Sequence, residues 1–237
     1  MRHVIVVGVG PGLGLALARK FAALGAAVGL IARSADELER HCAELAATDA
    51  RAAYRAADAG DPAELAAAIA SLEAENGPCD TLIYNAAVLR PGYPADLTTS
   101  RLRAEFDVNV IGAFSAAQAV WPGMVRRERG ALLFTGGGLS LEPYPEWTSL
   151  ALGKAALRNL AFSLHKDLSP QGIVVSVIAI CGIIEPGGPF DPDRVAALYA
   201  ELAAGSPADT PREVVFQPPG TNPDYNAPKQ VPKGPAD

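Results

Sequence analysis

The stretch Val4-Ile5-Val6-Val7-Gly8-Val9-Gly10-Pro11-Gly12-Leu13-Gly14 decides the fold of this chain. A short apolar run ends in glycines at every second position, and an alanine-rich helical pattern begins where they end. A glycine turn between a strand and a helix lets a phosphate approach the backbone, and the helix N-terminus adds free N–H groups. The pattern predicts a nucleotide site at Gly8, Gly10, Gly12, Leu13 and Gly14, and its alternative is a purely structural turn.

The rest of the chain repeats this alternation of short apolar runs and longer helical patterns. Strands are expected at residues 4–7, 27–32, 52–57, 81–84, 131–135 and 173–180. Helices are expected at residues 13–24, 36–47, 62–75, 99–127 and 149–168. Apolar runs without alternation are typical of parallel strands covered on both faces. The fold class is therefore α/β, a single Rossmann-type doubly wound parallel sheet in three layers.

Local signals mark several helix ends. Ser34 can cap the second helix with Glu37 three residues on, and Asp61 precedes a proline at the first position of the third. Gly25 and Gly77 stand just past helix ends, where a left-handed residue is favoured.

The predicted domain covers residues 1–216 and closes with one helix at 192–204 and a short strand at 213–216. We interpret the segment 186–204 as a lid over the cleft, and its Phe190, Leu198 and Tyr199 suggest a partly apolar ligand. The proline-rich residues 217–237 are expected to form an extended or disordered tail. The alternative is that this tail lies along the surface or against a neighbouring subunit.

Composition excludes several classes of function. The net charge of −6 argues against nucleic acid as the main partner. Cys42, Cys79 and Cys181 lack metal-ligand spacing, so we expect reduced thiols, a cytoplasmic protein and no metal. The apolar runs fall short of the roughly 20 residues that span a bilayer, so no membrane partner is expected.

The glycines at 8, 12 and 14 have the spacing found in the short-chain dehydrogenases/reductases, and the resemblance continues to about residue 184. Asn85-Ala86-Ala87 resembles a family motif that shapes the cofactor cleft, and Asp58 with Ala59 stands where the family contacts adenine. The resemblance implies an active-site supporting role for Asn109. It also implies that Lys154 is catalytic and holds the nicotinamide ribose, and that Gly182 and Ile184 contact the nicotinamide amide.

Cofactor preference depends on the end of the second strand, where an acid would favour NAD by accepting from the ribose 2′-OH. Ala32 stands there instead, and Arg33 and Ser34 could meet a 2′-phosphate. The sequence therefore favours NADP(H), with NAD(H) possible. The alternative is that Arg33 is an exposed charge at the start of a helix.

The catalytic positions depart from the family pattern. The resemblance places a tyrosine four residues before the lysine and a serine thirteen before the tyrosine, and this chain has Leu150 and Gly137 there. Leucine cannot donate a proton, so the family's usual carbonyl reduction cannot be transferred to this chain. Tyr144 lies in the segment just before the helix expected at 149–168 and is a candidate catalytic residue, with pocket lining as its alternative.

Three functions follow. The first is an atypical NADP(H)-dependent oxidoreductase acting on a small, partly apolar substrate, with water, a substrate group or a loop residue as proton source. The others are a non-redox isomerase, cyclase or dehydratase that uses the same cleft, and a non-catalytic NADP-binding protein. The resemblance also implies a homodimer or homotetramer paired through residues 99–127 and 149–168. Residues suited to that packing are Leu152, Ala156, Asn159, Leu160 and Ser163, and the alternative is that some of them are buried within one subunit.

Overall fold

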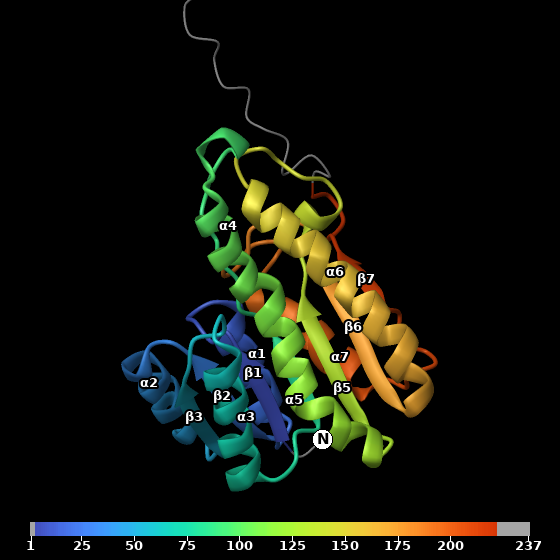
Figure 1. Cartoon of the computed structure of the whole chain (residues 1–237). Coiled ribbons are helices and arrows are strands. Elements are labelled where there is room, and N and C mark those ends of the chain that lie inside the picture. The colour runs from blue at the N-terminus through green and yellow to red at the C-terminus, as the bar shows by residue number, and fades with distance from the viewer. Residues whose placement is uncertain (1–2, 222–237) are drawn as a thin grey trace, which may run out of the picture.

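The computed structural model describes residues 3–221 and is built around one parallel sheet of seven strands (Figure 1). The strands are β1 (His3–Val7), β2 (Ala27–Ala32), β3 (Ala52–Ala56), β4 (Thr81–Tyr84), β5 (Gly130–Thr135), β6 (Ile173–Ile180) and β7 (Glu213–Phe216). Their spatial order is β3-β2-β1-β4-β5-β6-β7. This topology confirms the predicted single doubly wound α/β sheet. The order reverses between β1 and β4, which is where such sheets bind ligands at their carboxyl edge.

Helices cover both faces and complete the three layers (Figure 1). One face carries α1 (Leu13–Ala23), α2 (Ala35–Ala46) and α7 (Pro192–Ala204). The other carries α3 (Pro62–Asn76), α4 (Thr99–Phe106), α5 (Gly112–Arg126) and α6 (Thr148–Leu168).

Alternate side chains of the central strands enter two separate apolar cores. Val4 and Val6 of β1 pack with α1 and α7, whereas Ile5 and Val7 pack with α3, α5 and α6. Both sets are fully buried, which explains the unbroken apolar runs in the sequence. The edge strands β3 and β7 are the exceptions: Arg55 of β3 reaches out to Glu75 at 2.8 Å, and Val215 of β7 is 48% exposed.

The capping predictions are confirmed. The Ser34 hydroxyl accepts from the Glu37 N–H at 3.3 Å, and the Asp61 carboxylate accepts from the first turn of α3 at 2.8 and 3.0 Å. Gly25 and Gly77 have φ angles of 81° and 85°, which other residues rarely adopt.

The helix predicted at 99–127 is confirmed in extent, since the structure is helical over Thr99–Arg126, but it is not α-helical throughout. A π-helical turn, Asp107–Ile111, separates α4 from α5. The Tyr84 hydroxyl donates to the Val108 carbonyl at 2.5 Å, so a side chain outside the helix binds a backbone oxygen within the turn. Sequence periodicity cannot reveal such a contact.

The stretch Thr99–Arg126 is long and apolar enough to cross a membrane, with a mean hydropathy of 1.2 in its most apolar window. That window is 44% buried inside the fold, and α5 supplies Ala113, Ala117 and Val120 to the core beneath α3 and α6. A core helix has the same length and composition, so this stretch is weak evidence for a membrane span.

Only the first residues of the proposed tail lie in the described part of the chain. Residues 217–221 form a short turn in which Pro218 is buried and its carbonyl accepts from the Thr221 hydroxyl at 2.6 Å. The remaining tail, residues 222–237, lies outside the described residues, and its predicted extended or disordered state stays a prediction.

Candidate nucleotide and active site

Two of the loop glycines are required by close backbone packing. Gly8 has a φ of 90°, and its N–H donates to the Ile31 carbonyl at 2.8 Å. A Cβ atom at Gly8 would overlap the backbone of Ala86, and one at Gly14 would lie 2.6 Å from the Gly8 oxygen. These two glycines therefore let β1, α1 and the end of β4 meet.

The other two glycines face open space. No described atom lies within 4 Å of a Cβ built at Gly10 or Gly12. Gly12 is the N-cap of α1, and no side chain of the described residues caps that helix, while Leu13 anchors its first turn in the core. An uncapped helix N-terminus behind bare glycines suits an anionic group such as a pyrophosphate.

The ends of β2 and β3 lie side by side at the same edge of the sheet. Arg33 and Ser34 are exposed there, and the Ser34 hydroxyl is already engaged as the cap of α2. Asp58 is exposed after β3, and its carboxylate accepts from the Gly60 N–H at 2.8 Å. The Ala59 carbonyl lies so close to Gly112 of α5 that a Cβ there would overlap it. The structure thus brings these four predicted residues to one edge.

Asn85 joins the end of β4 to the glycine loop. Its backbone N–H donates to the Val7 carbonyl at 2.8 Å, and its side-chain amide donates to the Gly8 carbonyl at 2.8 Å. Ala86 and Ala87 follow, half-buried, where the chain turns past Gly8. The predicted motif therefore fixes the loop by direct contact.

Asn109 lies in the π-helical turn and is 2% exposed. Its side-chain oxygen accepts from the Val88 N–H at 2.8 Å. Its Nδ2 is buried without a hydrogen-bond partner among the described residues, and a Cβ at Gly153 of α6 would lie 3.0 Å from it. Asn109 therefore connects the segment after β4 to the helix that carries Lys154.

Lys154 is 7% exposed and points at the carboxyl end of β5, where its ammonium group donates to the Thr135 carbonyl at 2.5 Å. Burial away from water lowers the pKa of Lys154 to about 8. Leu150 is buried one helical turn earlier, and a Cβ at Gly137 would be 3.9 Å from the Lys154 Cγ. The two positions where the family pattern has its tyrosine and serine thus hold an apolar side chain and bare backbone.

Tyr144 lies in the loop between β5 and α6, half-buried, with its carbonyl accepting from the Trp147 N–H at 2.9 Å. The Glu146 carbonyl in this loop accepts from the Gly92 N–H at 2.7 Å, which ties the loop to the segment after β4. The catalytic role of Tyr144 stays a prediction.

The segment after β6 differs from the predicted lid. Phe190 and Tyr199 are 2% and 0% exposed and pack into the core with α1, so their predicted role in contacting a ligand was wrong. A Cβ at Gly182 would overlap the Phe190 ring, which gives this glycine a packing reason. Ile184 packs partly against the same core, and both residues lie at the carboxyl end of β6 as expected.

Two polar groups at the site were missed by sequence reasoning. Thr135 is 6% exposed and is the last residue of β5. It forms hydrogen bonds with Asn85, Lys154 and Tyr199. A threonine ending an apolar strand beside three glycines was the available signal. Arg101 binds the buried carboxylate of Glu105 at 2.7 Å and the Pro91 carbonyl at 2.8 Å, which holds the segment after β4 in place. Nothing in the local sequence pattern indicated that contact.

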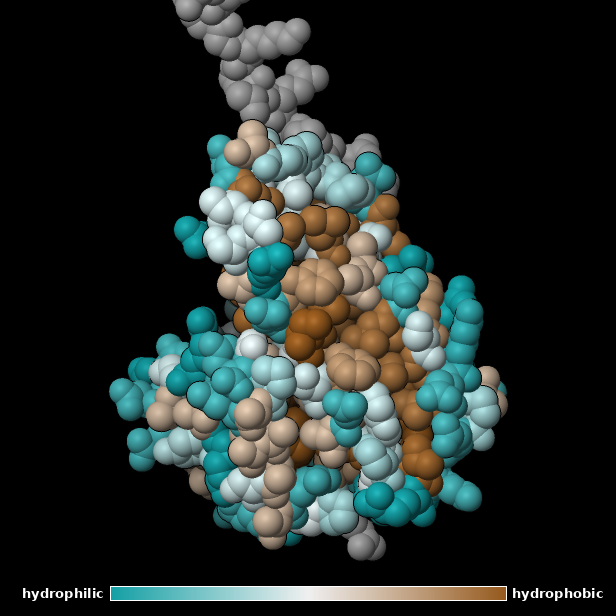
Figure 2. All heavy atoms as spheres, in the orientation of Figure 1, coloured by the Kyte–Doolittle hydropathy of each residue, from teal (hydrophilic) through white to brown (hydrophobic). Residues whose placement is uncertain are grey.

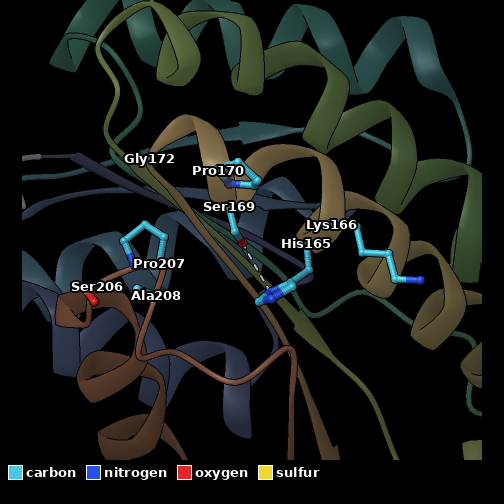
Figure 3. A pocket seen from close by; sticks show the side chains of 8 residues that line it. All are labelled: His165, Lys166, Ser169, Pro170, Gly172, Ser206, Pro207 and Ala208. Carbon is cyan, nitrogen blue, oxygen red and sulfur yellow. Dashed lines mark hydrogen bonds between the residues drawn. The ribbon is translucent and has the colours of Figure 1, made fainter.

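A surface depression of about 500 Å³ lies away from this site (Figure 3). It is lined by the end of α6, the start of β6 and the loop between α7 and β7. Within it the His165 Nδ1 and the Ser169 Oγ are 3.3 Å apart, while Lys166 extends away from the other lining residues (Figure 3). Because β6 begins beside it, the depression is at the amino edge of the sheet, opposite the glycine loop.

Within residues 3–221, no group of three or more His, Cys, Asp or Glu residues is arranged to hold a metal ion. The three cysteines are free, and burial raises the pKa of Cys42 to about 11 and also raises that of Cys181. A raised pKa disfavours the thiolate that a nucleophile requires.

The comparisons with known proteins agree with this architecture. Residues 2–187 match the family described as short chain dehydrogenase, and the chain belongs to that family. It is 30% identical over 196 residues to 2,3-dihydro-2,3-dihydroxybenzoate dehydrogenase of Bacillus subtilis, covering 83% of this chain and 72% of that protein.

Two solved structures show the same fold. A metagenomic short-chain oxidoreductase in complex with NADP has a TM-score of 0.84 and 28% identity, with 92% of this chain and 97% of that chain covered. A 3-oxoacyl-[acyl-carrier protein] reductase from Brucella melitensis with bound NAD has a TM-score of 0.82 and 26% identity, covering 90% and 88%.

Proposed function

We propose that this chain is an NADP(H)-dependent oxidoreductase that transfers hydride to or from a small, partly apolar organic substrate. The observation that carries the proposal is the open cradle at Gly10 and Gly12, joined through Asn85 and Thr135 to the buried amine of Lys154. A dinucleotide fits this arrangement, because the helix N-terminus suits its pyrophosphate and the lysine suits a ribose hydroxyl. Family membership and the NADP- and NAD-bound neighbours support the same proposal.

When bound, the nicotinamide supplies or accepts the hydride. The protein's own groups would orient it. Gly182 and Ile184 follow β6, Lys154 bonds to the end of β5, and Asn109 bonds to the segment after β4, all at the carboxyl edge of the sheet. The proton remains to be supplied by water, a substrate group or a loop residue such as Tyr144, because Leu150 has no acidic group. This atypical arrangement favours substrates that need little acid assistance, such as an iminium or an activated alkene.

We propose NADP(H) over NAD(H) because Arg33 is exposed at the end of β2 and no acid stands at Ala32. Titration of intrinsic and NADPH fluorescence tests this preference. The Arg33→Ala variant should lose affinity for NADPH and keep its affinity for NADH. Arg40→Ala, further along α2, is the matched control. Equal losses for both cofactors would remove the assigned role of Arg33.

The buried Leu150 also favours two other candidates. One is a non-redox isomerase, cyclase or dehydratase in the same cleft, and the other is a protein that binds NADP without catalysis. Transfer of deuterium from labelled NADPH to a product, followed by mass spectrometry in a screen of carbonyl, imine and enone compounds, separates these functions. Label in the product supports the oxidoreductase. Product without label supports the non-redox enzyme.

Exposed apolar side chains at the carboxyl edge support a partly apolar substrate. Leu89, Leu141 and Ile183 are 71%, 42% and 61% exposed and follow β4, β5 and β6, which are adjacent strands. Large apolar groups left in water at one edge of a sheet are typical of a ligand-binding surface.

We further propose a cytoplasmic homodimer or homotetramer that pairs through α5 and α6. Figure 2 shows apolar side chains gathered over the middle of the face that these helices form. Three large apolar residues of these helices and of the turn before α5 are also exposed: Ile111, Phe114 and Leu152 at 39%, 38% and 50%. Light scattering tests the pairing: Leu152→Arg should yield monomer, whereas Leu24→Arg, at the end of α1, should not.

A further inference from the structure

A buried chain of hydrogen bonds connects helix α7 to the glycine loop. The Tyr199 hydroxyl lies 2.7 Å from the Thr135 hydroxyl, which donates to the Asn85 side-chain oxygen at 3.0 Å. Because the single proton of Thr135 is directed at Asn85, Tyr199 is the donor in the first bond. The Asn85 amide then donates to the Gly8 carbonyl at 2.8 Å.

Packing alone does not call for these hydroxyl groups. Tyr199 is 0% exposed and lies in an apolar core with Val195, Ala196 and Phe190. Phenylalanine and valine would fill the positions of Tyr199 and Thr135 without burying polar atoms, and a buried polar atom without a partner costs about 1–3 kcal/mol. The two hydroxyls are therefore explained by the hydrogen bonds that they make and not by the space that the side chains fill.

Both backbone polar groups of Gly8, at the start of the loop, are hydrogen-bonded, and the second of them is bonded to the last residue of this chain of hydrogen bonds. The Gly8 N–H is held by the Ile31 carbonyl at 2.8 Å, and the Gly8 carbonyl is held by Asn85. With φ at 90°, Gly8 turns the backbone so that Gly10 and Gly12 face open space. The Thr135 carbonyl also accepts from the Lys154 ammonium group, so Thr135 bonds both to Lys154 and to Asn85, the residue that holds the glycine loop.

We propose that Tyr199 is a positioning residue: its hydroxyl orients Thr135 and Asn85, and these hold the glycine loop in the form that accepts the pyrophosphate of a dinucleotide. This inference rests on the proposed function, since it assumes that a dinucleotide binds at the loop. It assigns a part in cofactor affinity to α7, a helix that packs against α1 and β5.

The test compares two ligands in binding titrations. NADPH carries the pyrophosphate, and adenosine 2′-monophosphate carries neither pyrophosphate nor nicotinamide. We expect Tyr199→Phe to raise the NADPH Kd about five- to tenfold, as for loss of one oriented hydrogen bond, and to leave the adenosine 2′-monophosphate Kd within about twofold. Thr135→Val should raise the NADPH Kd about tenfold or more, and the double variant should add little to it.

Thr135→Ser keeps the hydroxyl that Thr135→Val removes, so its NADPH Kd should be close to that of the wild type. Tyr54→Phe in β3 is the matched control for loss of a tyrosine hydroxyl and should leave the NADPH Kd unchanged. A lowered melting temperature with unchanged NADPH affinity in Tyr199→Phe would overturn the inference, and so would equal losses for both ligands. If the wild-type chain binds neither NADPH nor NADH, the proposed function fails and this inference fails with it. If the wild type binds and Tyr199→Phe binds equally well, the inference alone fails.

Discussion

The buried amine of Lys154 should make the folded chain gain stability as the pH rises. The pKa of Lys154 falls from an ordinary 10.5 to about 8 because burial removes water from its ammonium group. At about 1.4 kcal/mol per pKa unit, this difference lowers the free energy of unfolding by about 3 kcal/mol whenever the amine is charged in both the folded and the unfolded chain. The cost is present in full below about pH 8, where folded and unfolded chains both hold the proton.

Between about pH 8 and 10.5 the unfolded chain holds more protons than the folded chain, so the free energy of unfolding rises with pH in that window. Lys154→Met removes the charge and keeps an unbranched side chain. It also leaves the Thr135 carbonyl without its side-chain donor, which costs about 1–3 kcal/mol. We therefore expect the variant to be more stable than the wild type by about 1 kcal/mol at pH 7.

Urea unfolding of both proteins at half-unit steps from pH 6.5 to 10 measures this difference. The advantage of Lys154→Met should shrink by about 1 kcal/mol or more per pH unit above pH 8 and then reverse. Lys166→Met, at an exposed position of α6, controls for the loss of one positive charge. A difference between wild type and Lys154→Met that stays constant from pH 7 to 10 would refute the reasoning.

The remaining predictions distinguish residues needed for packing from residues needed for binding. Gly14→Ala should lower the free energy of unfolding by about 2 kcal/mol or more, because its Cβ would lie 2.6 Å from a backbone oxygen. Gly10→Ala, where the Cβ meets open space, should leave thermal stability unchanged and weaken NADPH binding. Asp61→Ala should destabilise the protein by about 1 kcal/mol in urea, because α3 loses both cap hydrogen bonds. Leu150→Tyr should raise NADPH oxidation with simple ketones if the rest of the site is intact, and no gain over wild type would count against an intact site.

Features set by local chemistry were predictable. The glycine stretch before α1, the caps at Ser34 and Asp61, and the positive-φ glycines at 25 and 77 all depend on residues a few positions apart. The apolar runs likewise predicted the strands, because a strand covered on both faces must be apolar throughout. Their order in the sheet was not predicted, because pairing joins segments distant in the sequence.

The π-helical turn at Asp107–Ile111 marks the limit of this reasoning. The segment has a regular helical pattern, yet the Tyr84 hydroxyl, more than twenty residues earlier, binds a carbonyl within it. The assignment of Phe190 and Tyr199 to a ligand surface failed for the same reason. An apolar pattern on a helix shows that one face is buried, and only packing shows what lies against it.

The sequence by itself determined the α/β class, the glycine cradle and the position of Lys154 in its helix, because these follow from periodicity and spacing. Only the tertiary structure decided the environment of that lysine and the path from Tyr199 through Thr135 and Asn85 to Gly8. The physical reason is that burial and hydrogen-bond direction depend on groups from β1, β4, β5 and α7, which come together only when the sheet is assembled. The pKa of Lys154 and the shape of the loop are thus properties of the fold.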